Sequence, residues 1–107
     1  MAFRSVRSDV ELLTVCGNVL VAIAANPQAL LRELADATGI TERTVQAAIA
    51  ELEAAGYLTR ERTGRRNRYT VHPDAPLRHA GPGIAHVGPV LELLARHPST
   101  GPSEPEG

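Results

Sequence analysis

The spacing of apolar residues changes once along this chain of 107 residues, and the change falls at Gly56. Before Gly56, apolar side chains recur every three or four residues, which is the spacing of amphipathic helices. After it, the segments 57–62 and 67–71 follow a period of two residues, in which successive side chains alternate between two faces as they do in half-buried strands. The pattern therefore predicts a mainly α-helical chain with a small β-hairpin.

The first helix is predicted to begin at the capping residue Ser8 and to run to about Ala25. It stops at Asn26-Pro27, because the residue before a proline is pushed away from helical backbone angles. Its apolar residues cover more than one face, and such a helix is buried from two directions. In so small a chain we expect the second direction to be another subunit.

Two further helices are predicted over 31–38 and from about 41 to 55. Gly39 suits the left-handed position that ends a helix, and Thr41 is a good N-cap for the next one. Gly56 ends that third helix. Its core face is formed by the apolar residues at helical spacing, namely Val45, Ala48, Ile49 and Leu52.

Charge is concentrated in the predicted hairpin. Residues 57–72 carry five arginines and one glutamate, a net charge of +4, on a chain whose net charge is −1. The turn 63–66, with Gly64 at a position that needs a positive φ, places two of these arginines at the tip. A basic segment on an otherwise acidic chain is typical of a local anion-binding feature.

The domain organisation follows from these elements. We expect a flexible N-terminus over 1–8, one folded domain over 9–72, a Pro- and Gly-rich loop over 73–83, a final amphipathic helix over 84–97 and a disordered tail over 98–107. No apolar run approaches the ~20 residues that cross a bilayer, so no membrane segment is predicted. The single cysteine and the absence of a convincing signal-peptide cleavage site favour a cytoplasmic protein.

Residues 31–58 resemble the winged helix-turn-helix of bacterial transcriptional regulators and are similar to DNA-binding domains of the MarR and IclR type. The resemblance covers about residues 12–72. The positions that carry it are Leu34, Ala35, Gly39, Thr44, Val45, Leu52, Ala55, Gly56, Tyr57 and Leu58. It implies a three-helix core with a wing, to which the apolar spacing after residue 84 adds a C-terminal helix. It also implies a sequence-specific transcriptional regulator that binds double-stranded DNA. No nucleophile-base-acid arrangement, phosphate-binding glycine loop or pair of carboxylates stands out in the sequence, so no catalytic site is predicted.

In such motifs the third helix enters the major groove. On its exposed face, Arg43 can bridge guanine O6 and N7, and Gln46 can pair with adenine. Thr41 and Thr44 suit phosphate contacts, and Ala47 is small enough to touch a thymine methyl group. Glu42 either accepts a hydrogen bond from cytosine or supports the start of the helix.

The hairpin is expected to supply binding that does not depend on sequence. Its tip and strands would reach a flanking minor groove or its phosphates through Arg62, Arg65, Arg66 and Arg68. The alternative is that these arginines form a solvated face together with Glu61. A second function also stays open, in which the winged helix contacts other proteins and binds DNA weakly or not at all.

A homodimer is expected, since two copies can read two half-sites. The candidate dimer surface combines residues of the first and last helices, namely Leu12, Val15, Val19, Val87, Val90, Leu91 and Leu94. Alternatively, the last helix packs back on its own domain. The chain departs from full-length MarR proteins, which have longer terminal helices, and it has no IclR effector domain. These departures argue against a built-in ligand pocket, and the effector is unknown. A third and weaker hypothesis is regulation by a ligand or by redox state through the cleft between the first helix and the last one.

Cys16 and the histidines give weaker signals. Cys16 lies in the first helix and is expected to be a buried structural thiol rather than a redox sensor. His72, His79 and His86 are spaced seven residues apart, but prolines and glycines between them exclude a continuous helix. No metal site and no cofactor are therefore predicted.

Overall fold

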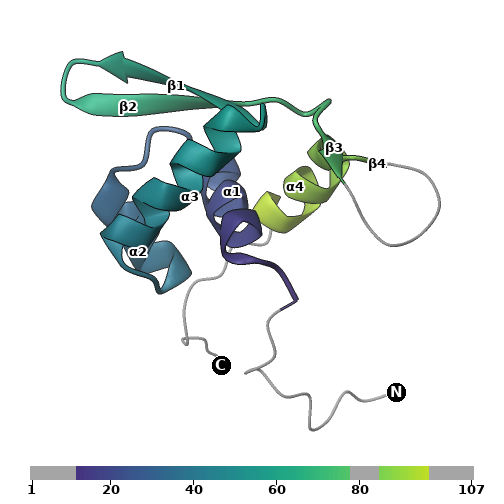
Figure 1. Ribbon diagram of the computed structural model, residues 1–107, viewed down its shortest axis with the longest axis horizontal. Coiled ribbons are helices and arrows are strands. Elements are labelled where there is room, and N and C mark those ends of the chain that lie inside the picture. Colours follow the sequence, from purple (N-terminus) through teal and green to yellow (C-terminus); the bar gives the residue numbers. More distant parts are fainter. Residues whose placement is uncertain (1–11, 78–84, 97–107) are drawn as a thin grey trace, which may run out of the picture.

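The computed structural model describes residues 12–77 and 85–96. In chain order its elements are α1 (Val15–Ala25), α2 (Leu31–Thr38), α3 (Glu42–Ala54), β1 (Leu58–Thr63), β2 (Arg66–Val71), β3 (Pro76–Leu77), β4 (Ala85–His86) and α4 (Val87–Arg96). Figure 1 shows α1 at the centre, with α2 and α3 on one side, α4 on the other, and the β1–β2 hairpin extending over α2 and α3. The predicted winged-helix fold is confirmed.

Helix α1 begins later than the sequence pattern predicts. Thr14 is its N-cap, and the Thr14 hydroxyl accepts a hydrogen bond from the Gly17 N–H at 3.1 Å. Leu12 and Leu13 precede the helix and are exposed, while Ser8 lies outside the described residues. The start was misplaced because Thr14 stands inside an apolar run, where its hydroxyl gives no visible boundary.

Two apolar faces of α1 are covered within a single chain, although Val15 in its first turn is 41% exposed. One face packs against α2 and α3, and another packs against α4. The second direction of burial is therefore α4, and the expectation of another subunit at that place is wrong. The sequence could not decide this, because an apolar helix face has the same composition whichever chain covers it.

The α2–turn–α3 unit matches the prediction closely. Gly39 ends α2 in the left-handed region with φ of 75°. The Thr41 hydroxyl accepts a hydrogen bond from the Thr44 N–H at 3.1 Å and so caps α3. At the other end, the Tyr57 and Gly56 N–H groups donate to the carbonyls of Leu52 and Glu53. This pair of bonds is a Schellman motif, and the φ of 91° at Gly56 makes it possible.

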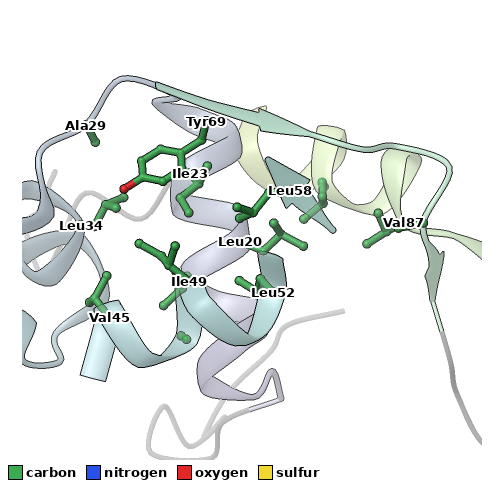
Figure 2. Close-up of a cluster of buried hydrophobic side chains, with 14 residues drawn as sticks. Leu20, Ile23, Ala29, Leu34, Val45, Ile49, Leu52, Leu58, Tyr69 and Val87 are labelled. Atoms are coloured by element: carbon green, nitrogen blue, oxygen red, sulfur yellow. The ribbon is translucent and has the colours of Figure 1, made fainter. Parts of the chain in front are cut away.

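One apolar core joins the helices to the hairpin (Figure 2). The most deeply buried large side chains are Val19, Ile23, Leu34, Val45, Ile49 and Leu58. All four residues expected on the core face of α3 are buried. Figure 2 shows the Tyr69 ring pointing from β2 into this cluster, on the side of Ile23 and Leu34. The hairpin is thus attached to the helices by buried residues at its base.

A second attachment holds the outer edge of β2. The Tyr69 N–H donates to the Pro27 carbonyl at 2.9 Å, which ties β2 to the connection between α1 and α2. Strands β1 and β2 are antiparallel and pair from Leu58 with Val71 to Thr63 with Arg66. The hairpin loop therefore consists of Gly64 and Arg65, and Gly64 has the predicted positive φ, 64°.

Two short strands occur where the sequence predicts none: β3 lies in the expected loop over 73–83, and β4 lies in the first residues of the expected final helix over 84–97. β3 pairs with β4 in antiparallel fashion, and the Tyr57 hydroxyl donates to the Pro76 carbonyl at 2.6 Å. The final helix starts at Val87 instead of residue 84. At its first turn the Gly88 N–H donates to the Pro73 carbonyl at 3.0 Å, and a Cβ on Gly88 would lie 2.7 Å from the Pro73 Cβ. Glycine is required for this close approach, which no local sequence pattern reveals.

Candidate nucleic-acid interface

The outward face of α3 presents four residues in a stripe. Arg43, Gln46, Ala47 and Ala50 are all exposed and follow the spacing that places residues on one side of a helix. The opposite side is buried against α1 and α2. The long polar groups of Arg43 and Gln46 lie in the first half of the stripe, and two alanines follow. A surface of this kind can approach a base edge closely and form hydrogen bonds at one end.

Thr41 and Thr44 are joined to each other at the start of α3. The Thr41 hydroxyl donates to the Thr44 hydroxyl at 3.0 Å while it accepts from the Thr44 N–H. Because a hydroxyl has a single proton that can rotate, Thr41 can donate to a ligand only when its proton turns away from Thr44. The Thr44 hydroxyl accepts the bond and keeps its own proton for donation. Both residues are exposed beside Glu42, which lies in the first turn.

The strand register divides the hairpin arginines between two faces. Residues directly opposite each other in an antiparallel pair share a face. Arg62 lies opposite Asn67 and shares the face of Tyr69, whereas Arg68 lies opposite Glu61 on the other face. Arg60, which was not among the predicted site residues, approaches Glu53 of α3 at 3.5 Å. Arg65 stands in the loop at the tip and is exposed.

Arg66 has a contact that the sequence did not predict. Its Nη1 donates to the backbone carbonyl of Gln28 at 2.6 Å, across 38 positions of sequence. This bond holds the wing to the connection between α1 and α2, next to the bond from the Tyr69 N–H to Pro27. Arg66 therefore positions the wing as well as carrying charge. A guanidinium has five N–H donors, so several remain for a ligand.

A hollow of about 140 Å³ lies beside this contact. It is lined by Gln28, Thr63, Arg66, Asn67 and Arg68. Sequence reasoning named the two arginines but missed Gln28, Thr63 and Asn67. Thr63 and Asn67 flank the basic turn and could have been noted as polar neighbours. Nothing local points to Gln28, because only the folded chain brings it to the hairpin.

The residues expected at a dimer surface are separated by the fold. Val19, Val87 and Leu91 are buried in the core of the single chain, so they are unavailable to a second chain. Their apolar side chains are covered by the packing of α1 against α4. The others are exposed or half-buried, namely Leu12, Val15, Val90 and Leu94. Leu93, which was missed, is 55% exposed on α4.

Cys16 is half-buried rather than fully buried, and its Sγ donates to the Glu51 carboxylate at 3.1 Å. Burial, this hydrogen bond and the charge of Glu51 raise the pKa of the thiol to about 11. The reactive form of a cysteine is the thiolate. The site therefore favours an inert thiol, as the structural interpretation expects.

We predict that Cys16 reacts with an aromatic disulfide reagent at pH 8 about a hundredfold more slowly than the same cysteine in urea, because its thiolate fraction is that much smaller. The rate can be followed by absorbance of the released thiol. A Glu51→Gln variant, which removes the charge, should react faster than the wild type. Equal rates in the folded and unfolded chains would contradict the raised pKa.

The described residues give no support to a metal site. Residues 12–77 and 85–96 contain no group of three or more histidine, cysteine or acidic side chains that could hold a metal ion. His72 instead shares a hydrogen bond of 2.6 Å between its Nε2 and the Thr59 hydroxyl, and His79 lies outside the described residues. Over the same ranges no helix is long and apolar enough to cross a bilayer.

Comparison with known proteins agrees with this geometry. A family model described as MarR family matches residues 12–68, which is more than half of the chain. The matched segment runs from the residues before α1 to the second strand of the hairpin. No curated protein matches the chain.

Proposed function

The chain belongs to the MarR family of DNA-binding transcription regulators, and on this premise we propose that it recognises a specific duplex sequence. In this proposal the exposed stripe of α3 lies in the major groove and the wing contacts flanking DNA. The base-reading and phosphate contacts of α3 come from Thr41, Arg43, Thr44, Gln46 and Ala47. Those of the wing come from Arg62, Arg65, Arg66 and Arg68.

One observation carries the proposal, namely that α3 buries one side and exposes a polar stripe on the other. An arginine and a glutamine in the first half of that stripe are the side chains that pair bidentately with guanine and adenine. The hairpin extends over the same side of the molecule as α2 and α3 (Figure 1). A duplex seated on α3 is thereby brought near the arginines of the wing.

The proposal is tested by binding of the full chain to duplexes selected from a random DNA pool. We predict that an Arg62→Ala/Arg65→Ala double variant loses affinity for all duplex sequences to the same extent. The slope of log K against log salt should fall in magnitude by about two, because each phosphate contact contributes about one to that slope. Arg66 is left unchanged because it also anchors the wing to Gln28. Fluorescence anisotropy between about 50 and 200 mM salt measures both quantities.

The control is Arg96→Gln/Arg32→Gln, which removes two charges from α4 and α2 and leaves the wing intact. If the wild type and the double variant bind every duplex equally poorly at low salt, DNA recognition is contradicted and a winged helix that binds proteins is favoured.

A palindromic selected sequence would support a homodimer. We place the dimer contact at the exposed apolar residues Leu12, Val15 and Leu93, and the protein in the bacterial cytoplasm.

A further inference from the structure

We infer that the hollow between the wing and the α1–α2 connection is an anion site that takes one backbone phosphate of the bound duplex. The inference rests on the proposed function and adds Gln28, in the connection between α1 and α2, to contacts that the proposed function assigns to α3 and the wing. The residue that distinguishes it is Gln28, which neither the basic segment nor the helix-turn-helix includes. The hollow is defined by its five lining residues, Gln28, Thr63, Arg66, Asn67 and Arg68.

The chemistry of the lining selects an anion. Two guanidinium groups, two side-chain amides and a hydroxyl line the hollow, and no carboxylate is among them. These groups offer N–H and O–H donors, and arginine in particular matches phosphate oxygens with paired donors. Glu61 lies opposite Arg68 in the register, yet the two form no salt bridge within the described residues. The Arg68 guanidinium is thus not paired with the carboxylate of Glu61, its cross-strand neighbour.

The site is partly organised before a ligand arrives. The bond from Arg66 Nη1 to the Gln28 carbonyl fixes the guanidinium at the rim and uses one of its five donors. Fixing a long side chain in advance removes part of the entropy cost that binding otherwise carries. The bond from the Tyr69 N–H to the Pro27 carbonyl joins β2 to the same α1–α2 connection one residue before Gln28. The hollow's volume of about 140 Å³ has room for several water molecules, at about 30 Å³ each, and so for a phosphate group.

The position of the hollow suits a phosphate of DNA. It opens on the hairpin, which extends over the side of the molecule that holds α2 and α3 (Figure 1). A duplex that contacts α3 and the wing tip passes along the hairpin, and its backbone carries a phosphate at every nucleotide. A free phosphate has the same chemistry, so the experiment separates the two sources.

The test is a Gln28→Glu variant, which places a carboxylate in the lining. Gln28 is exposed and holds Arg66 through its backbone carbonyl, so the substitution preserves that contact. We expect affinity for all duplexes to fall about tenfold or more, since a hydrogen-bonded charge contact is lost. The slope of log K against log salt should fall in magnitude by about one. Unchanged melting by circular dichroism verifies the fold.

Arg96→Gln is the matched control, because it changes the net charge by the same amount on α4, which lies across α1 from the wing. Its salt slope should equal that of the wild type. If Gln28→Glu behaves like this control while the wild type binds DNA with a steep salt slope, the hollow takes no DNA phosphate and the inference is overturned. If the wild type binds no duplex, the proposed function fails instead.

A second measurement addresses the free anion. Inorganic phosphate is titrated against chloride at constant ionic strength, and the amide signals of Arg66 and Asn67 are followed by NMR. A saturable shift in the wild type that is absent in Gln28→Glu supports an anion site even where no duplex binds. The same shift without any change in the DNA salt slope assigns the site to a free anion and overturns the DNA contact. No shift and no change in slope overturn the anion site altogether.

Discussion

An Ile49→Ala variant is expected to lose about 2–5 kcal/mol of unfolding free energy, because a large buried side chain is removed and the cavity refills only in part. Ile49 is 1% exposed and lies in α3 at the centre of the cluster in Figure 2. Small domains are stable by only about 5–15 kcal/mol in total. The substitution therefore removes a large share of what holds α3 in place. Urea denaturation followed by circular dichroism measures the loss.

Gln46→Ala on the same helix is the control for this prediction. Gln46 is exposed, and exposed substitutions usually change stability by less than about 0.5 kcal/mol. The two variants together separate the inner from the outer side of α3. Similar losses for both would show that α3 does not pack through Ile49. A stable Gln46→Ala protein with weakened DNA binding would instead assign that side chain to recognition.

An Arg43→Ala variant is expected to lose about 1–3 kcal/mol of binding free energy on the preferred duplex, which is roughly 5–150-fold in affinity. The reason is that a bidentate pair with guanine is lost at a single base position. Specificity at that position should relax, while the other positions keep theirs. Arg43 is exposed at the start of the α3 stripe, so stability should stay unchanged.

Arg32→Ala in α2 removes the same charge from another exposed helix residue and serves as the control. Fluorescence anisotropy at one fixed salt concentration measures the affinity of Arg43→Ala and of Arg32→Ala for the selected duplex and for its single-base variants. Equal and uniform losses for Arg43→Ala and Arg32→Ala would mean that Arg43 contacts a phosphate and reads no base.

Local signals in the sequence were sufficient for the central unit of the fold. Gly39, Thr41 and Gly56 mark the ends of α2 and α3, because a left-handed residue and a capping hydroxyl act through hydrogen bonds that span only a few positions. The apolar spacing of α3 and the alternation of the hairpin likewise depend on neighbours close in sequence. These elements appear within one or two residues of their predicted bounds.

Placement over long distances escaped the same reasoning. The sequence of α1 is the same whether α4 or another subunit covers its second apolar face, so only the folded chain shows that α4 does. The short β3–β4 pair and the approach of Gly88 to Pro73 likewise join segments whose local patterns read as a loop and a helix start. Thr14 was missed for a different and local reason, because it lies inside an apolar run and Ser8 is an earlier hydroxyl that could also cap a helix.

The change in apolar spacing at Gly56, together with the arginines that follow it, determined that this chain is a helical domain with a basic wing. Apolar periodicity and the residues that end helices act through neighbours close in sequence, so they can be read without the fold. The tertiary structure decided which arginines of that wing are free to meet a ligand and which also hold it in place. Arg66 reaches the Gln28 carbonyl across 38 residues of sequence, and Arg68 and Glu61 stand opposite each other only once the strands pair in register. Such contacts follow from how the elements dock, and no window of neighbouring residues contains them.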